Sequence, residues 1–198
     1  MKATFFDTYV ILELKHVKGG LHVDNKTALL VLEVQQGLFD KDKFRLYKEE
    51  ALLKNIRNLI DRAHEEGAMV IYLQHSDEDS GFIKGTKEWE IHPYIQPIEK
   101  DYVIENHTPN AFYKTKLHDL LTREDIKYLV ITGVQTEGSI DTTCRQAFSL
   151  GYHNILAKDA HTTFDSIPLT AQQIIDHHHR IMANWFAELI SSEDIEFF

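Results

Sequence analysis

The chain has 198 residues, of which 43% are hydrophobic and only four are proline, which is enough for one globular domain with an adequate core. A formal net charge of −10 with scattered Lys and Arg residues excludes an electrostatic surface for nucleic acid or for an anionic membrane. Because the sequence has one cysteine, no apolar run of about 20 residues and no signal-peptide pattern, we expect a cytoplasmic protein without membrane spans or an internal disulfide.

The first 26 residues differ from the rest of the chain. The runs TYVILEL and GLHV flank Lys18, Gly19 and Gly20 in the manner of a β-hairpin. A hairpin of this size needs the main sheet or a second subunit to bury its apolar face. We therefore expect an N-terminal β-hairpin extension over 1–26 and a main domain over 27–198.

From residue 27 onward, apolar β-rich runs alternate with segments of helical periodicity. The expected strands cover residues 28–34, 68–73, 102–104, 128–131, 154–157 and 194–198. The expected helices cover about 52–63, 112–121, 140–148 and 170–189. This alternation predicts an α/β fold, a Rossmann-like three-layer sandwich in which helices cover both faces of a mostly parallel six-stranded sheet.

Local signals mark the ends and the buried faces of the helices. Gly67 and Gly151 are expected C′ residues, and Thr170 with Gln173 forms an expected capping box. The predicted buried stripe of the third helix is Ile140, Cys144, Ala147 and Phe148. The predicted stripe of the last helix is Ile174, Ile175, His178, Ile181, Met182, Trp185, Phe186 and Leu189.

Two polar residues stand where carboxyl ends of strands are expected, the edge at which such sheets bind ligands. Glu33 follows five apolar residues, so it either emerges into solvent or is a general acid or base whose pKa burial raises. Ser139 lies where a helix begins, and the free N–H groups there suit an anion or a developing oxyanion. The long polar connection 75–100 is expected to determine the substrate.

Several motifs occur in a fixed order between residues 27 and 185. They are LLVLEVQQG, YLQHSDE, WEIHP, VIENHTPNAFYKTKL, GVQTEGSIDTTCRQAFSLGY, KDAHTTFD and IIDHHHRIMANWFA. The ordered set resembles the isochorismatase-like cysteine hydrolase superfamily. The resemblance implies hydrolysis of small-molecule amides through an acyl-enzyme, with an aspartate that activates a cysteine and a lysine that supplies positive charge between them.

All three catalytic positions depart from the family pattern. The aspartate falls on Glu33, the lysine on Asn106 and the cysteine on Ser139. A serine needs a strong adjacent base, and His107 is a candidate for that role. Cys144 is interpreted as a small core residue.

Other functions stay open beside the amide hydrolase. Isochorismate-cleaving members of the superfamily protonate a vinyl ether without a cysteine, a reaction for which Glu33 would supply the proton and Gln74 a substrate contact. The chain could instead be an inactive relative, decayed or engineered, that binds a small molecule or a partner protein. The hydrolase is the favoured interpretation.

The resemblance also implies a non-proline cis peptide between Val134 and Gln135. Backbone N–H groups of the following turn, which includes Gly138, would then stabilise an oxyanion. The aromatic residues Phe39, Trp89 and Phe112 are either the apolar wall of a substrate pocket or ordinary core and loop-anchoring residues.

No metal or other cofactor is expected. His177, His178 and His179 point about 100° apart on a helix, so they are poorly placed to bind one ion. His75, Asp77 and Asp79 lack the histidine spacing of a zinc site. The expected partners are a small-molecule substrate and, as the resemblance implies, further copies of the chain in a homodimer or a higher homo-oligomer.

Overall fold

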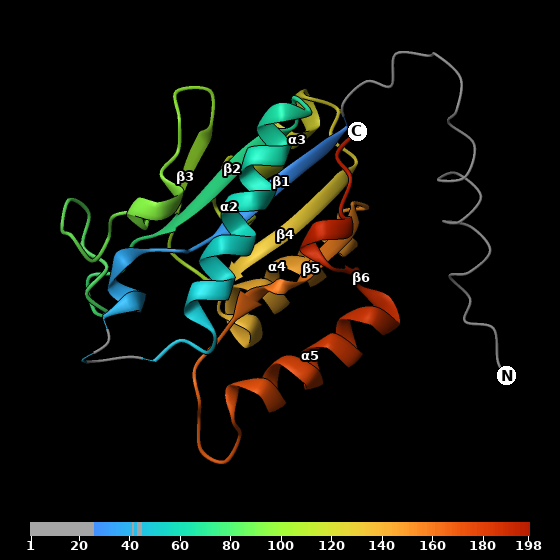
Figure 1. The fold of residues 1–198 in the computed structure, drawn as a ribbon. Coiled ribbons are helices and arrows are strands. Elements are labelled where there is room, and N and C mark those ends of the chain that lie inside the picture. Colours follow the sequence, from blue (N-terminus) through green and yellow to red (C-terminus); the bar gives the residue numbers. More distant parts are fainter. Residues whose placement is uncertain (1–25, 41, 43–44) are drawn as a thin grey trace, which may run out of the picture.

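The computed structural model describes residues 26–40, 42 and 45–198, so the expected hairpin over 1–26 lies outside the described residues apart from Lys26. The described residues form a six-stranded sheet with the order β3-β2-β1-β4-β5-β6 (Figure 1). Every neighbouring pair of these strands is parallel. The strands are β1 (Thr27–Leu32), β2 (Met69–His75), β3 (Tyr102–Asn106), β4 (Tyr128–Val134), β5 (His153–Thr162) and β6 (Glu188–Ile190).

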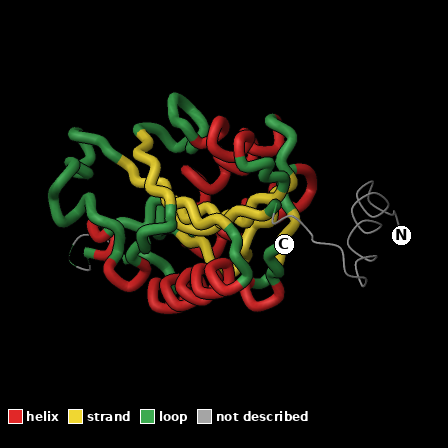
Figure 2. The backbone as a smooth tube through the Cα atoms, turned by 90° about the horizontal axis from the view of Figure 1, so that it is seen from above, coloured by secondary structure: helices red, strands yellow, loops and turns green. Residues whose placement is uncertain are grey.

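Helices cover both faces of the sheet, as expected (Figure 2). They are α2 (Glu49–Glu65), α3 (Leu117–Arg123), α4 (Asp141–Ser149) and α5 (Ala171–Trp185). Side chains of β1 alternate between the two layers, with Leu29 and Val31 in the apolar cluster that contains α2. Leu30 and Leu32 belong to the cluster that contains α3, α4 and Met182 of α5. Period-two alternation in a fully buried strand therefore holds the three layers together.

The strand order reverses direction between β1 and β4, in the middle of the sheet. The chain runs outward from β1 to β3 and then returns to form β4 on the other side of β1. Ligands bind where the strand order reverses in this way, outside the carboxyl ends of the strands. A ligand site is therefore expected at the carboxyl ends of β1 and β4.

Gly133 permits close contact between β1 and β4 at that edge. Its φ is +128°, and a Cβ atom built there would lie 2.1 Å from the carbonyl oxygen of Leu32. Glycine is the residue that fits such a backbone approach. The close contact joins Leu32, the residue before Glu33, to Gly133, the residue before Val134.

Helix-end signals in the sequence are confirmed. Gly67 and Gly151 follow α2 and α4 with φ values of 76° and 89°. Thr170 and Gln173 form the expected reciprocal capping box at the start of α5.

The prediction for the end of the chain was wrong. The sixth strand is Glu188–Ile190, which pairs with β5, whereas 194–198 contains no strand. Ile195 and Phe197 instead bury their side chains in the α2 layer of the core. The backbone carbonyl of Phe198 accepts a hydrogen bond from the N–H of Lys26 at 2.7 Å. An alternating apolar pattern cannot distinguish an edge strand from an extended segment whose side chains fill a gap.

Three helix predictions also need correction. The helix expected over 112–121 covers Leu117–Arg123, and Phe112 lies before it. Phe148 and Trp185 are 41% and 65% exposed, so neither belongs to the buried stripe expected of its helix. Leu189 lies in β6 rather than in α5, because α5 ends at Trp185.

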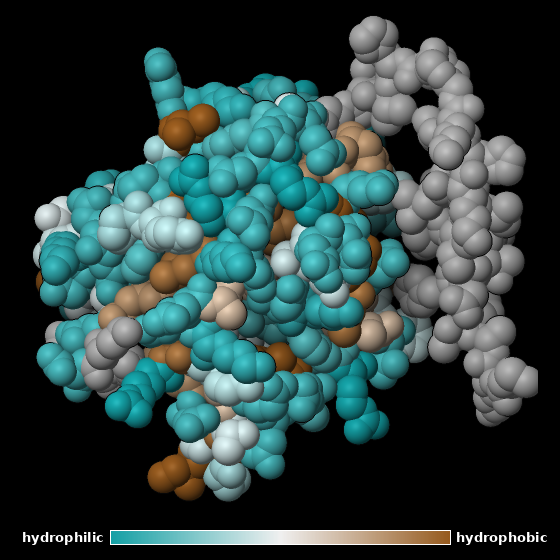
Figure 3. Space-filling view, in the orientation of Figure 1, coloured by the Kyte–Doolittle hydropathy of each residue, from teal (hydrophilic) through white to brown (hydrophobic). Residues whose placement is uncertain are grey.

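The surface on the face shown in Figure 3 is mostly hydrophilic, with apolar residues in small separate groups. No helix among the described residues has the length and apolar character needed to cross a bilayer.

Candidate active site

Glu33 directly follows β1 at the edge where the strand order reverses. Its φ is 55°, a left-handed conformation that few non-glycine residues adopt, and its backbone N–H donates to the carbonyl of Leu73 at 2.9 Å. Burial raises the pKa of Glu33, while the hydrogen bonds that its carboxylate accepts from Asn106 and Ser139 oppose the rise. Residues in such conformations cluster at functional sites, and a raised pKa suits a general acid or base.

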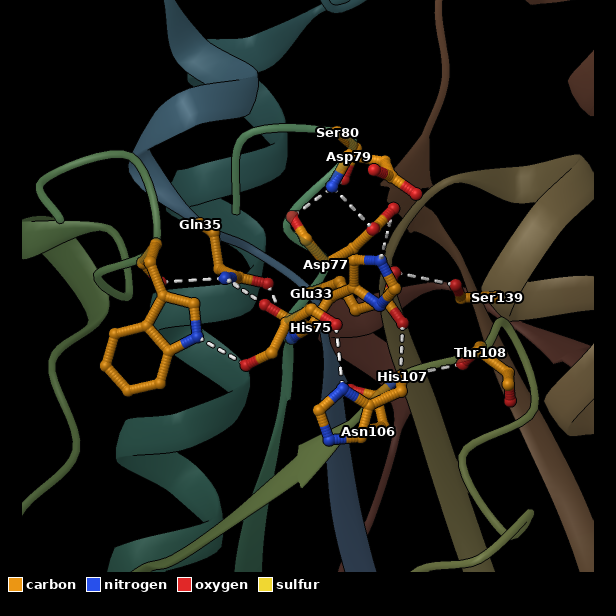
Figure 4. Close-up of polar contacts among 12 residues, drawn as sticks. Glu33, Gln35, His75, Asp77, Asp79, Ser80, Asn106, His107, Thr108 and Ser139 are labelled. Carbon is orange, nitrogen blue, oxygen red and sulfur yellow. Dashed lines mark hydrogen bonds and ion pairs between the residues drawn. The ribbon is translucent and has the colours of Figure 1, made fainter. Parts of the chain in front are cut away.

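The Glu33 carboxylate joins side chains from two other segments (Figure 4). Ser139 Oγ donates to Glu33 Oε2 at 2.7 Å, and Asn106 Nδ2 donates to Glu33 Oε1 at 2.6 Å. Asn106 ends β3 and also donates to the carbonyl of Thr108 at 2.8 Å. The three positions singled out in the sequence therefore form one hydrogen-bonded group in which each carboxylate oxygen has a donor.

The turn that carries Ser139 runs from Thr136 to Ile140 and leads directly into α4. It begins after a cis peptide between Val134 and Gln135, the bond that the family resemblance implied. The carbonyl of Gln135 accepts from the N–H groups of Gly138 at 3.2 Å and Ile140 at 3.1 Å. The Gly138 N–H is thus used inside the turn, and Ser139 is held at the start of a helix.

A cavity of about 240 Å³ opens at this group. Among the site residues expected from the sequence, Glu33, Val134, Gln135, Gly138 and Ser139 line it. The other lining residues are Gln35, Leu38, His75, Asp77, Ser80, Phe82 and Pro109. The volume suits a small substrate or one end of a longer one.

The buried side chain of Gln35 holds the two ends of the loop that follows β2, part of which lines the cavity. Its Nε2 donates to the carbonyls of His75 at 2.9 Å and Trp89 at 2.7 Å, while its Oε1 accepts from the N–H of His75 at 2.8 Å. The Trp89 ring donates to Ser76 Oγ at 2.7 Å. Loop residues that lie far apart in the sequence are therefore held beside the end of β2.

Comparison with known proteins identifies the family to which this fold belongs. The family model of the isochorismatase domain matches residues 27–194. The chain belongs to the isochorismatase family. This confirms the resemblance seen in the ordered motifs.

Relatives within the family span most of the chain. The isochorismatase family protein YddQ of Bacillus subtilis (strain 168) is 36% identical over 140 residues, which are 69% of this chain and 78% of that protein. A streptothricin hydrolase of Streptomyces noursei is 32% identical over 85% of this chain and 66% of its own length. A secreted isochorismatase effector, Isc1 of Verticillium dahliae, is 29% identical over 85% of this chain and 90% of its own.

Solved structures of the family share the fold. The crystal structure of one isochorismatase family protein has a TM-score of 0.80 and 34% identity, and covers 85% of this chain and 99% of that chain. An isochorismatase from Pseudomonas putida KT2440 has a TM-score of 0.83 and 25% identity, and covers 99% of this chain and 100% of that chain.

Four predicted substrate-binding residues of this isochorismatase family member do not line the cavity. Gln74 is buried and donates through Nε2 to the carbonyl of Trp89 at 2.9 Å, so both residues anchor the loop. Phe39 packs against the α2 layer of the core and lies 4.5 Å from the His92 ring. Phe112 stacks on Tyr152 in the opposite layer.

Neither His107, the candidate base, nor Cys144, the expected core residue, forms a hydrogen bond with the Glu33–Ser139 pair in the described part of the chain. His107 Nδ1 contacts the carbonyl of Ser76 at 2.9 Å, and its side chain is 69% exposed. Cys144 is fully buried on α4, where burial raises the pKa of its thiol. Glu33 and Ser139 instead contact each other directly.

The connection 75–100 was expected to determine the substrate, but its individual cavity residues were not singled out; they are His75 at the end of β2 and Asp77, Ser80 and Phe82 in the loop that follows. The one available signal was position, because this segment follows the carboxyl end of β2. Within the described residues, no group of three or more His, Cys, Asp or Glu side chains is arranged to hold a metal ion.

Proposed function

We propose that this isochorismatase family hydrolase cleaves the C–N bond of a small amide, with Ser139 as nucleophile and Glu33 as the group that accepts and returns the proton. The hydrogen bond of 2.7 Å from Ser139 Oγ to Glu33 Oε2, at the wall of the cavity, is the observation that carries this proposal. A nucleophile within hydrogen-bond reach of a base is the arrangement that covalent catalysis requires.

In the first half of the reaction, Ser139 Oγ attacks the amide carbonyl carbon while its proton passes to Glu33. The protonated Glu33 then gives the proton to the departing nitrogen, and the C–N bond breaks to leave an ester on Ser139. In the second half, water attacks the ester carbonyl carbon while one of its protons passes to Glu33. Glu33 then returns that proton to the departing Ser139 Oγ, and release of the carboxylic acid restores both side chains. Because burial raises the pKa of Glu33, its carboxyl group is better suited to both proton transfers than an exposed glutamate.

Asn106 is the positioning residue for this pair. Its amide donates to Glu33 Oε1 and to the Thr108 carbonyl, which leaves Oε2 directed to Ser139. An amide supplies a hydrogen bond without the positive charge of a lysine, so it stabilises the Glu33 carboxylate less strongly. Since a hydroxyl is also much less acidic than a thiol, we expect slow turnover.

The vinyl-ether reaction is less well supported than amide hydrolysis. It needs the Glu33 proton but no nucleophile, whereas Ser139 Oγ is placed directly on the carboxylate. Gln74, the residue expected to contact that substrate, binds the loop backbone. The relative from Streptomyces noursei is itself named as a hydrolase of streptothricin.

The test is ammonia release from a panel of small primary amides and N-carbamoyl compounds by the purified protein. Glu33→Gln and Ser139→Ala should each lower turnover by at least about a hundredfold, since each removes one partner of the proton transfer. Glu65→Gln on the exposed last turn of α2 makes the same chemical change away from the cavity and should retain activity. Trapping of a mass increase on Ser139 would identify the acyl-enzyme.

Turnover that survives both site variants would refute this mechanism. A wild-type protein that binds but does not convert the panel would favour the alternative of an inactive family member. The expected homodimer or higher oligomer and the cytoplasmic location stay predictions, which light scattering and cell fractionation can test.

A further inference from the structure

We infer that the cavity selects an amide that carries an ammonium or guanidinium group, and that Asp77 receives this cationic group. The inference rests on the proposed function, because it names the class of substrate for the same site. It follows from the charge, the aromatic surface and the construction of the cavity wall opposite the Glu33–Ser139 pair.

The ionisable lining of the cavity is acidic. Glu33 and Asp77 supply its carboxyl groups, and His75 lies beside both. None of the described residues that line the cavity is a lysine or an arginine. Figure 4 shows His75 next to Glu33, with Asp77 on the other side of the imidazole. A carboxylate-bearing substrate would therefore meet like charge in this cavity, whereas a cation would meet opposite charge.

Asp77 is held in its charged form by the loop that carries it. Hydrogen bonds from the Ser80 side chain and from the Asp79 backbone lower the pKa of Asp77. The Asp79 N–H donates to Asp77 Oδ1 at 3.0 Å. The other oxygen, Oδ2, lies 4.0 Å from His75 Nε2, a separation longer than a hydrogen bond. That oxygen retains capacity for a stronger donor.

The two ring nitrogens of His75 have different surroundings. Its Nδ1 atom is buried and has no hydrogen-bond partner among the described residues. A proton on Nδ1 would therefore be buried without an acceptor, which is costly. A proton on Nε2, which faces Asp77, avoids that cost. The distance of 4.0 Å from Nε2 to Asp77 Oδ2 leaves that carboxylate oxygen open to a ligand.

Phe82 completes the recognition surface. An antiparallel bridge joins Asp77 to Phe82, and the Asp77 N–H donates to the Phe82 carbonyl at 3.1 Å. The Phe82 ring lies 6.0 Å from the His75 ring and lines the cavity together with Leu38. An aromatic ring beside a carboxylate suits an alkyl chain that ends in an ammonium group, through apolar contact and cation–π attraction.

The first experiment measures binding, so that it does not depend on turnover. The ligands are 6-aminohexanamide, heptanamide and adipamate, which are similar in length and differ in terminal charge. Titration of the Ser139→Ala variant with each ligand should give about fivefold tighter binding of 6-aminohexanamide than of heptanamide, and the weakest binding of adipamate. Higher salt should reduce the difference.

Asp77→Asn tests the assignment to a single residue, because it retains an oxygen that can accept the Asp79 N–H. In the Ser139→Ala background it should abolish the preference for 6-aminohexanamide while the affinity for heptanamide changes little. Asp79→Asn is the matched control, since Asp79 is exposed in the same loop but does not line the cavity. It should retain the preference.

Equal binding of the three ligands, or equal loss of preference in both aspartate variants, would overturn the inference. Preferential binding of the cationic amide without ammonia release in the wild-type protein would support the inference and count against the proposed hydrolysis. Ammonia release with no dependence on terminal charge would support the hydrolysis and refute the role of Asp77. The two proposals therefore fail in distinguishable ways.

Discussion

Acid should destabilise this protein through the buried imidazole of His161. This residue lies near the carboxyl end of β5 and is 4% exposed. Its Nδ1 contacts Thr136 Oγ1 at 2.8 Å, in the turn that carries Ser139, and its Nε2 contacts His179 Nε2 at 2.8 Å. Burial, with smaller effects of His179 and His178, lowers the pKa of His161 from 6.5 to about 3.

The sign of the effect follows from proton uptake on unfolding. Between pH 6.5 and pH 3 the unfolded chain binds a proton at this position and the folded protein does not, so stability falls as the pH falls through that range. With these two pKa values, linkage gives a loss of about 2 kcal/mol between pH 8 and pH 5. Burial also lowers the pKa of His179, which adds a loss in the same direction.

Urea unfolding at pH 8, 6.5 and 5 measures this dependence. His161→Asn should lower stability at pH 8, because it opens a small cavity, and should remove about 2 kcal/mol of the acid-dependent loss. His177→Gln, at an exposed position on α5, should leave the dependence as it is. An unchanged dependence in His161→Asn, or an NMR titration of His161 in the folded protein with a midpoint near pH 6.5, would refute the reasoning.

Three further predictions concern the site. Gly133→Ala should lower the free energy of unfolding by at least about 3 kcal/mol and Tm by roughly 6 °C or more, because the new Cβ would lie 2.1 Å from the Leu32 carbonyl oxygen. Gly138→Ala is the control in the same thermal melt, since the nearest atom to its new Cβ would lie 3.9 Å away. Ser139→Cys should raise kcat/KM for amides about tenfold or more, because a thiol gives its proton to Glu33 more readily than a hydroxyl does; equal or lower activity would count against Ser139 as nucleophile. Gln35→Ala should lower the free energy of unfolding by about 2 kcal/mol and raise KM more than it lowers kcat, since three hydrogen bonds to the backbone of His75 and Trp89 are lost. Unchanged amide hydrogen exchange over residues 76–92 would contradict the role of Gln35 in holding the loop.

Much of the fold was predictable because it depends on local patterns. Apolar runs alternating with helical periodicity predicted the parallel sheet and its two helical layers, and the glycines and the capping box marked helix ends. The end of the chain was not predictable in this way. Whether Glu188–Ile190 or 194–198 joined the sheet depended on which segment met the free edge of β5.

The central residues of the site were also visible in the sequence. Glu33, Asn106 and Ser139 each stand at or after the end of a strand, and parallel strands bring such positions to one edge of the sheet. The sequence did not show that Ser139 and Asn106 would each bind a different oxygen of the same carboxylate. That pairing depends on the left-handed conformation at Glu33 and on the turn before α4.

The loop side of the cavity wall was determined by tertiary structure. Gln35 binds the Trp89 carbonyl across 54 residues of sequence, and this contact helps to set the path of the loop after β2 that brings Asp77 and Phe82 to the cavity. No periodicity records such a contact, because loops lack a repeating pattern and their paths follow from the groups that they meet. The sequence therefore determined which chemistry is available at the sheet edge, and only the folded loop decided which side chains face the substrate.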